Sequence, residues 1–154
     1  MRKTDREIKD INEIAALLNE CDTLRLGFND EECPYIVPLS FGFEQVGDAF
    51  VFYVHGAKAG RRHSLAEKAE LVCVEADICK GYVTLHGGSL TADYRSFIGK
   101  GRIETVSGPE AVHGLELLCR HCGFETMPCA QAVVDMTCVE KITVGEFTAK
   151  QRFK

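Results

Sequence analysis

The sequence predicts a small, mainly β fold: an antiparallel barrel with helices packed against its outside. Five or six segments of the 154-residue chain carry the apolar pattern of strands, and some of them contain a glycine or proline that permits a bend. Two or three amphipathic segments lie outside this series, and strands and helices do not alternate as they do in parallel α/β folds. With 45% apolar residues, we expect one domain over residues 1–154.

The first third of the chain predicts one helix and two strands. Thr4-Asp-Arg-Glu7 has the form of a capping box, and apolar residues then recur at helical spacing up to residues 19–22. Residues 23–28 alternate as a strand, and residues 34–41 form a second strand that contains Pro38. Because proline lacks a ladder N–H, Pro38 indicates an edge, a bulge or a neighbour that is not a strand.

The middle of the chain predicts two more strands around a short helix. Residues 49–54 form one strand, and the helix is expected at residues 61–68. Residues 70–76 are almost continuously apolar, which predicts a central strand buried on both faces. Residues 78–92 contain three glycines and little periodicity, so we expect a loop.

The last third predicts a bent strand, a helix and a closing strand. Residues 94–106 form a long strand in which Gly99 and Gly101 permit curling, and Gly108-Pro-Glu110 begins a helix. A closing strand follows at residues 139–147. The expected buried side of the helix consists of Val112, Leu115, Leu118, Cys119 and Cys122.

Charge and composition exclude several classes of protein. The formal charge of −5 argues against nucleic acid as the main partner, because binding to a phosphate backbone needs a broad basic face. The N-terminus is charged, and nowhere do eighteen apolar residues follow one another. We therefore expect a cytoplasmic protein without a membrane partner.

A cluster of basic residues stands out against this acidic background. Residues 49–66 contain no Asp or Glu, yet residues 55–63 hold His55, Lys58, Arg61, Arg62 and His63. A strand-to-helix turn offers backbone N–H groups, and arginine adds paired donors that match phosphate oxygens. This basic turn therefore predicts a site for a phosphate-bearing anion, and the alternative is a solvated basic helix start.

Eight cysteines are many for this length, and we expect reduced thiols rather than disulfides. Cys73 and Cys138 occupy positions where a small apolar residue belongs. Cys119, Cys122 and Cys129, with His121 or Cys138, could be drawn as a zinc site. However, a second close cysteine pair is missing, so we predict no metal site.

Six segments in order carry a family resemblance. They are Met-Arg-Lys-Thr-Asp-Arg-Glu-Ile (1–8), Leu-Arg-Leu-Gly-Phe (24–28), Pro-Tyr-Ile-Val-Pro-Leu-Ser-Phe-Gly-Phe (34–43), Phe-Tyr-Val-His-Gly-Ala-Lys-Ala-Gly-Arg-Arg (52–62), Leu-Val-Cys-Val-Glu-Ala-Asp (71–77) and Tyr-Arg-Ser-Phe-Ile-Gly-Lys-Gly-Arg (94–102). Together they resemble the flavin-binding split-barrel proteins related to pyridoxamine 5′-phosphate oxidase, in the branch that includes the nitroimidazole-resistance reductases.

The resemblance implies an antiparallel split β-barrel that forms a homodimer, with FMN held at the subunit interface. The implied contacts to the cofactor are Pro38, Leu39, Ser40 and Phe41 along the isoalloxazine edge, His55, Gly56, Ala57, Lys58, Arg61 and Arg62 around the phosphate, and Ser96. His55 is also the candidate catalytic residue, as a substrate contact or proton donor. The alternative for His55 is a hydrogen bond to the phosphate or to the turn.

The function implied by the resemblance is an FMN-dependent oxidoreductase that reduces a small acceptor such as a nitroaromatic compound. The alternative is a flavin or haem carrier of the same fold without catalysis, and F420 is another cofactor compatible with the resemblance. Pyridoxamine-phosphate oxidase activity is a third, weaker reading, because the chain lacks the C-terminal segment with Arg and His that the resemblance would require for that substrate.

Overall fold

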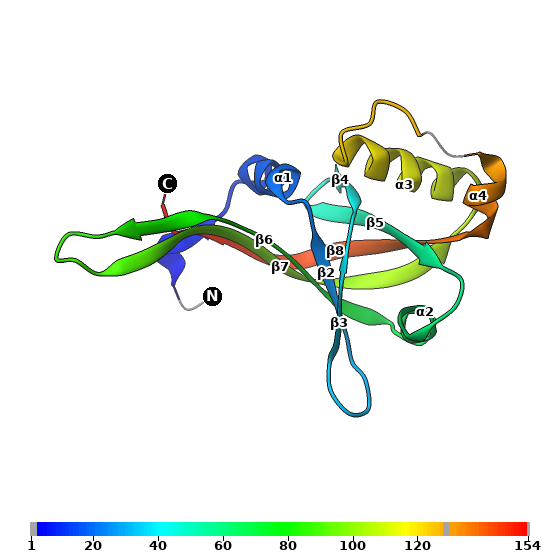
Figure 1. The fold of residues 1–154 in the computed structure, drawn as a ribbon, viewed down its shortest axis with the longest axis horizontal. Helices are drawn as coiled ribbons and strands as arrows, with labels where there is room; N and C mark the ends of the chain where they lie inside the picture. The colour runs from blue at the N-terminus through cyan, green and yellow to red at the C-terminus, as the bar shows by residue number, and fades with distance from the viewer. Residues whose placement is uncertain (1–2, 128–129, 154) are drawn as a thin grey trace.

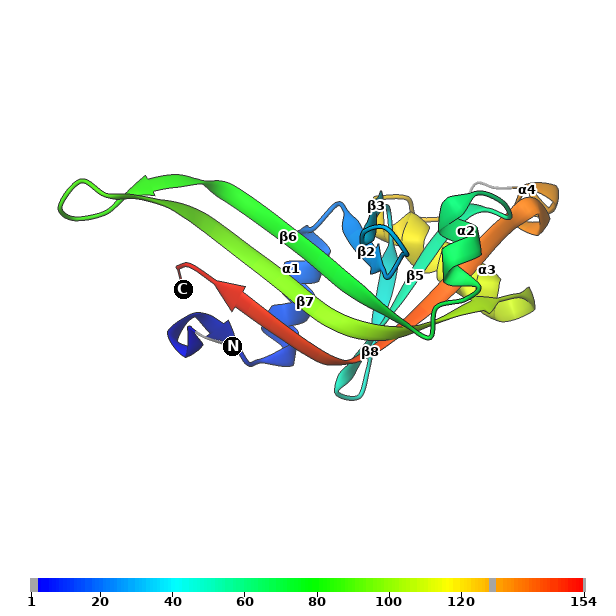
Figure 2. The same cartoon turned by 90° about the horizontal axis from the view of Figure 1, so that it is seen from below.

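The computed structural model describes residues 3–127 and 130–153, and it contains one curved antiparallel sheet with helices outside it (Figures 1 and 2). The strand order is β3-β2-β6-β7-β8-β5-β4, and β1 pairs with β8. The predicted fold class is therefore confirmed.

The strands are β1 (Glu7–Ile8), β2 (Leu24–Phe28), β3 (Tyr35–Leu39), β4 (Gly42–Val46), β5 (Ala49–Ala57), β6 (Leu71–Thr84), β7 (Leu90–Val106) and β8 (Thr137–Gln151). The helices are a 3-10 turn (Thr4–Arg6), α1 (Ile11–Glu20), α2 (Arg61–Ala66), α3 (Gly108–His121) and α4 (Gln131–Met136).

Close packing at two glycines bends the long strands. A Cβ atom on Gly99 would lie 2.5 Å from the Val144 side chain, and one on Gly101 would lie 2.3 Å from that of Ile142. The pairing register between β7 and β8 shifts between Lys100 and Gly101. The predicted bend in this strand is confirmed, and it curls the sheet around a core of aromatic rings. The core rings include Phe41, Phe50, Phe52 and Phe97.

The β3 strand lies at one edge of the sheet, where Pro38 faces Arg25 of β2. This position confirms the prediction of a sheet edge, which was made because Pro38 lacks a backbone N–H. The opposite edge is β4, which pairs with β5 through a turn at Gly47, whose φ is +60°. The sequence analysis assigned no strand to Gly42–Val46, because its five residues lack a clear alternation.

The capping box predicted at Thr4 is wrong. Thr4–Arg6 forms a 3-10 turn, and the next two residues pair with the end of β8, with Glu7 opposite Lys150. Helix α1 begins later, at Ile11, where Asp10 Oδ1 accepts a hydrogen bond from Asn12 N at 2.8 Å. Pairing with the end of β8 thus places Glu7 and Ile8 in a strand, although the local sequence pattern predicted a helix there.

The loop predicted at residues 78–92 is also wrong, because most of it forms a projecting hairpin arm (Figures 1 and 2). Strands β6 and β7 stay paired as far as Thr84 and Leu90, across a register shift between Cys79 and Gly81. Gly87 and Gly88 have positive φ and close the tip. The glycines that suggested a loop therefore serve a bulge and a tight turn.

The prediction of a central β6 is confirmed, but its burial on both faces is wrong. Val72, Val74 and Ala76 are buried, whereas Leu71 and Cys73 on the other face are exposed. Cys73 is therefore not a core residue in the single chain, whereas Cys138 is buried as expected. The sheet has an outer face with apolar side chains that this chain does not cover.

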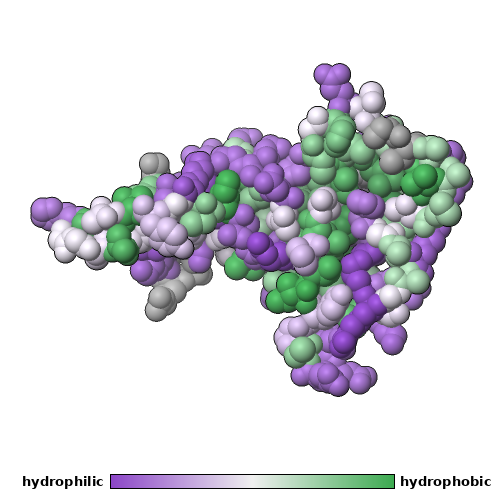
Figure 3. Space-filling view, in the orientation of Figure 1, coloured by the Kyte–Doolittle hydropathy of each residue, from purple (hydrophilic) through white to green (hydrophobic). Residues whose placement is uncertain are grey.

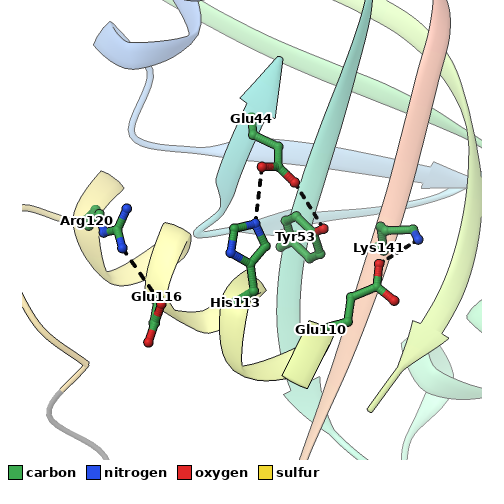
Figure 4. A network of polar contacts seen from close by, with 7 residues as sticks. All are labelled: Glu44, Tyr53, Glu110, His113, Glu116, Arg120 and Lys141. Carbon is green, nitrogen blue, oxygen red and sulfur yellow. Dashed lines mark hydrogen bonds and ion pairs between the residues drawn. The ribbon is translucent and has the colours of Figure 1, made fainter. Parts of the chain in front are cut away.

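Helix α3 begins at Gly108 as predicted, and polar contacts fix it to the sheet (Figure 4). Glu44 accepts a hydrogen bond from the Tyr53 hydroxyl at 3.3 Å and pairs with His113 Nε2 at 3.1 Å, while Glu110 pairs with Lys141 at 2.7 Å. Its buried side is rotated from the prediction, since Cys122 is exposed and Val112 and Cys119 are only half-buried. The buried residues of α3 are Ala111, Gly114, Leu115 and Leu118.

Helix α4 was not expected from the sequence, because it has six residues and only Val134 of these is buried. Helices α3 and α4 lie at the end of the molecule opposite the hairpin arm, where apolar surface gathers in Figure 3. None of the helices in the described part of the chain is long and apolar enough to cross a membrane.

Candidate functional site

The basic turn begins later than the sequence suggested, because β5 continues to Ala57. His55, Gly56 and Ala57 pair with Val139, Cys138 and Thr137 of β8, respectively. The turn itself ends at Gly60, whose φ of +98° favours glycine, and α2 follows at once. The predicted strand, turn and helix are present in the predicted order, and His55 lies within the strand, two residues before its end.

Each of the three cations of this segment has an acceptor within the chain. Lys58 Nζ donates to the carbonyl oxygen of Asp135 at 2.5 Å. Arg61 donates from Nε and Nη2 to Asp30 Oδ2, at 2.8 and 2.5 Å. Lys58 and Arg61 are exposed, so an anion from solvent can reach both.

Arg62 points inward and forms a buried ion pair. Its Nη1 lies 2.8 Å from Glu140 Oε1, and the exposed fractions of the two side chains are 12% and 1%. A Cβ atom on Gly56 would lie 2.3 Å from Arg62 Nη2, so the glycine makes room for the guanidinium. Glu140 was not predicted from the sequence, although it lies on the same face of β8 as the buried Ile142 and Val144. An acidic residue at a core-facing strand position was the available signal.

His55 lies at the mouth of a mainly apolar hollow of about 340 Å³. This apolar hollow also contains Ser40, Cys119 and Cys122, and helices α3 and α4 together with the segment between them supply most of its wall. The His55 side chain is accessible to solvent, yet the surrounding protein lowers its pKa by desolvation. The charge of Arg62 lowers the pKa further, and Glu140 opposes the shift. These surroundings favour the neutral form of His55 over the charged form.

We predict that His55 in the flavin-free protein titrates below its ordinary pKa of about 6.5. Between that value and its folded pKa, the unfolded chain binds a proton that the native chain does not, so stability falls as the pH decreases through this window. Proton-detected NMR of the imidazole carbons against pH checks this, with His55→Gln to assign the signal. A midpoint above 6.5 would contradict the prediction.

A second hollow of about 830 Å³, whose lining includes the acidic residues Glu116 and Asp135, adjoins the apolar hollow, because Val134 and Thr137 line both. Lys58 and His63 lie in its wall. The two hollows together offer an exposed cation at one end and an apolar surface beside His55 and Ser40 at the other. A long ligand with an anionic end and a planar apolar end matches this arrangement.

The remaining predicted contacts do not all reach these hollows. Ser96 is buried, its Oγ has no hydrogen-bond partner among the described residues, and it lies far from His55 within one chain. Val139 of β8 pairs with His55 of β5 on one side and with Val106 of β7 on the other, so these three residues lie side by side across the sheet. Ser96 is ten residues from Val106, or about 33 Å at ~3.3 Å per residue.

The residues of the strand before Ser40 also differ in their exposure. Pro38 is exposed and Leu39 is half-buried, whereas the Phe41 ring is fully buried beside Phe52. The Phe41 ring therefore belongs to the core, which leaves its backbone for any contact with a ligand.

Two histidines and the cysteine cluster take places that differ from the sequence expectations. His63, one of the residues of the basic cluster, has a side chain only 18% exposed. His121 Nε2 lies 2.8 Å from the Cys21 carbonyl oxygen, and its ring lies 4.2 Å from that of Phe41. Cys119 and Cys122 line the apolar hollow and Cys138 lines the second hollow, while Cys129 lies outside the described residues.

Comparison with known structures shows the same architecture in other proteins. One is a crystal structure of a candidate 5-nitroimidazole antibiotic resistance protein from Bacteroides thetaiotaomicron, which is 25% identical, with a TM-score of 0.82 over 94% of this chain and 85% of that one. A flavocytochrome from Azotobacter vinelandii is 21% identical, with a TM-score of 0.71 over 100% of this chain and 72% of that one. The FAD and heme binding protein of Mycobacterium smegmatis is 15% identical, with a TM-score of 0.73 over 97% and 74%.

The comparison with curated proteins found no match. The sequence model of the family described as pyridoxamine 5′-phosphate oxidase matches residues 10–151, which span the sheet from α1 to the end of β8. Proteins of this family bind flavins. This match covers nearly the whole chain, and it agrees with the split-barrel topology and with the ordered motifs of the sequence. The chain belongs to the pyridoxamine 5′-phosphate oxidase family of split-barrel proteins.

Proposed function

We propose that this protein binds FMN and uses it to reduce a small acceptor such as a nitroaromatic compound. The observation that carries the proposal is the pair of adjoining hollows, with an exposed cation at one end and an apolar surface beside His55 at the other. FMN has matching chemistry, since a phosphate and a planar ring system lie at its two ends.

The phosphate end would lie at Lys58 and Arg61. Both cations are exposed, and charge-assisted hydrogen bonds to phosphate are stronger than those to a carbonyl. Lys58 would exchange its bond to the Asp135 carbonyl for the phosphate, and Arg61 has a carboxylate partner, Asp30, that competes with it. Arg62 stabilises this segment from the interior of the protein through its ion pair with Glu140.

The ring end would lie along the apolar hollow, beside Ser40 and His55. When bound, the flavin accepts electrons from a donor such as a nicotinamide and passes them to an acceptor. Reduction of a nitro group to a nitroso group takes up two electrons and two protons and releases water. His55 is placed to hydrogen-bond the acceptor oxygen and to exchange a proton there.

An anaerobic reaction tests the reductase proposal. The FMN-loaded protein is reduced and then mixed with a nitroimidazole, and reoxidation of the flavin is followed by absorbance. We expect reoxidation faster than that of free reduced FMN, and a slower reaction in His55→Gln with FMN still bound. Reoxidation no faster than that of free FMN would support a flavin carrier instead.

We also propose that the protein acts as a homodimer with the flavin at the subunit interface. The outer face of the sheet exposes Leu71 and Ile98 by 56% and 45%, around a shallow hollow of about 850 Å³. The almost continuous apolar sequence of β6 is typical of a strand covered on both faces, and a second copy would supply the missing cover. A second copy is also the means by which Ser96 could lie near the cofactor.

The dimer proposal predicts a change in mass on substitution of one exposed residue. The wild-type protein is expected to elute with twice the mass of one chain in light scattering, and Ile98→Lys is expected to shift it towards one chain, because burial of an ammonium group in an apolar interface is costly. Val46→Lys, an exposed apolar position at the other edge of the sheet, is the matched control. A monomeric wild type at micromolar concentration would contradict the dimer.

A cytoplasmic location fits this proposal. The structure gives free thiols for Cys21, Cys33, Cys73, Cys79, Cys122 and Cys138. Such thiols are typical of reducing compartments.

A further inference from the structure

Three side chains that bind transition metals converge beneath α2. They are His63 on α2 and Cys138 and Glu140 on β8. One ligand atom from each lies within 4.8 Å of those of the other two. Cys138 and Glu140 are two residues apart on one strand and therefore share a face. Both are almost completely buried, at 2% and 0% exposure.

Two polar atoms of this cluster have no hydrogen-bond partner among the residues that the structure describes. Glu140 Oε1 accepts from Arg62 and lies 3.6 Å from Cys138 Sγ, whereas Oε2 is buried without a hydrogen-bond partner in the described part of the chain. His63 Nδ1 is also buried without one. Buried polar atoms in native proteins are almost always satisfied, so a carboxylate oxygen and a ring nitrogen left over in one cluster indicate a missing ligand.

The surroundings orient both groups in the manner typical of metal ligands. The other ring nitrogen of His63, Nε2, lies 3.5 Å from Glu67 Oε1 one turn along α2. A carboxylate on the far nitrogen of a histidine fixes its ring and tautomer in many metal sites. Arg62 fixes the Glu140 carboxylate in a similar way through its other oxygen. Glu140 thus has one oxygen fixed by Arg62 and one left for a ligand, while His63 has Nε2 near Glu67 and Nδ1 left for a ligand.

We propose that His63 Nδ1, Cys138 Sγ and Glu140 Oε2 bind one divalent transition-metal ion, with zinc as the best match. Nitrogen, sulfur and oxygen together suit zinc, whereas calcium and magnesium prefer oxygen alone. Zinc bonds of about 2.0–2.3 Å place tetrahedral ligand atoms roughly 3.3–3.8 Å apart. The observed limit of 4.8 Å therefore requires a closure of about 1 Å, within reach of small side-chain rotations.

The fourth position of this site would face the second hollow. His63 and Cys138 both lie in its wall, together with Thr137 and Lys58, so the hollow provides an entry path from solvent. Water or an anion can complete a three-ligand zinc site of this kind. The thiolate and the carboxylate offset the charge of the ion, and Arg62 contributes one positive charge nearby. The site does not depend on flavin, because it uses neither His55 nor Arg61.

Cobalt binding to the flavin-free, reduced and chelator-treated protein tests this proposal. We expect one cobalt ion per chain, an ultraviolet band from thiolate-to-cobalt charge transfer, and visible bands of tetrahedral intensity that zinc abolishes in competition. Cys138→Ser is expected to remove the charge-transfer band. His63→Ala and Glu140→Gln are expected to weaken cobalt binding at least tenfold. Cys79→Ser, a change of an exposed cysteine on the hairpin arm, is the matched control and should leave the band unchanged.

Two results would overturn the metal site. One is the absence of a charge-transfer band in the folded wild-type protein at millimolar cobalt. The other is a band that persists in Cys138→Ser but disappears in Cys119→Ser or Cys122→Ser. If Cys138→Ser does not fold, His63→Ala decides the matter, because His63 is only half-buried and lies on a surface helix. No flavin is present, so failure here is distinguishable from failure of the flavin proposal.

Discussion

Glu140→Ala is expected to lower the free energy of unfolding by about 3–5 kcal/mol, which is the typical effect of removing one partner of a buried ion pair. The carboxylate is completely buried, and the Arg62 guanidinium lies 2.8 Å away. Its removal leaves the charge of Arg62 in the protein interior beside Gly56 without a counter-ion. Urea denaturation followed by circular dichroism, at one fixed protein concentration, measures the change.

Two further variants separate charge from packing. Asp30→Ala breaks the exposed pair with Arg61, so we expect a change in unfolding free energy far smaller than that of Glu140→Ala. The double variant Arg62→Met, Glu140→Leu removes both charges and restores apolar volume, and it is expected to recover most of the lost stability. If Glu140→Ala were as mild as Asp30→Ala, the ion pair would not be a structural element of the turn.

The double variant Lys58→Ala, Arg61→Ala is expected to weaken FMN binding by about 100-fold. A hydrogen bond to a charged group contributes about 1.5–3 kcal/mol, and the lower value corresponds to about tenfold for each side chain. The lower value is appropriate because both cations give up a partner in the chain when they bind phosphate. Quenching of flavin fluorescence on titration measures the dissociation constant.

Riboflavin provides the sharpest control for this effect, because it lacks the phosphate. The double variant should bind riboflavin as the wild type does, and Lys68→Ala, which removes an exposed cation after the end of α2, should leave FMN binding unchanged. Equal losses for FMN and riboflavin would show that the variant disturbs the ring site or the fold. Arg62→Ala is not a suitable substitute, because its main effect is expected on stability.

The features of the site that could be predicted from the sequence are local ones. The strand that carries His55, the basic turn and the following helix depend on neighbouring residues, and they occur in the predicted order. Pro38 marked an edge strand through a property of its own backbone. Alternation and turn chemistry act over a few residues, so a sequence shows them directly.

The features that could not be predicted depend on pairing between distant segments. Arg62 and Glu140 are 78 residues apart, and only the register of β5 against β8 brings them together. The hairpin arm was hidden because Gly81 at a bulge and Gly87 at the tip interrupt the strand pattern. Helix α4 encloses the hollows beside His55, yet it is too short for helical periodicity to be evident.

Flavin binding is the central claim of this account, and the visible absorption spectrum of the purified protein tests it most directly. The spectrum is recorded before and after addition of FMN, and the released cofactor is identified by its mass. We predict a flavin spectrum with about one FMN per chain, either on purification or after reconstitution. A colourless protein that takes up no added FMN would contradict the claim.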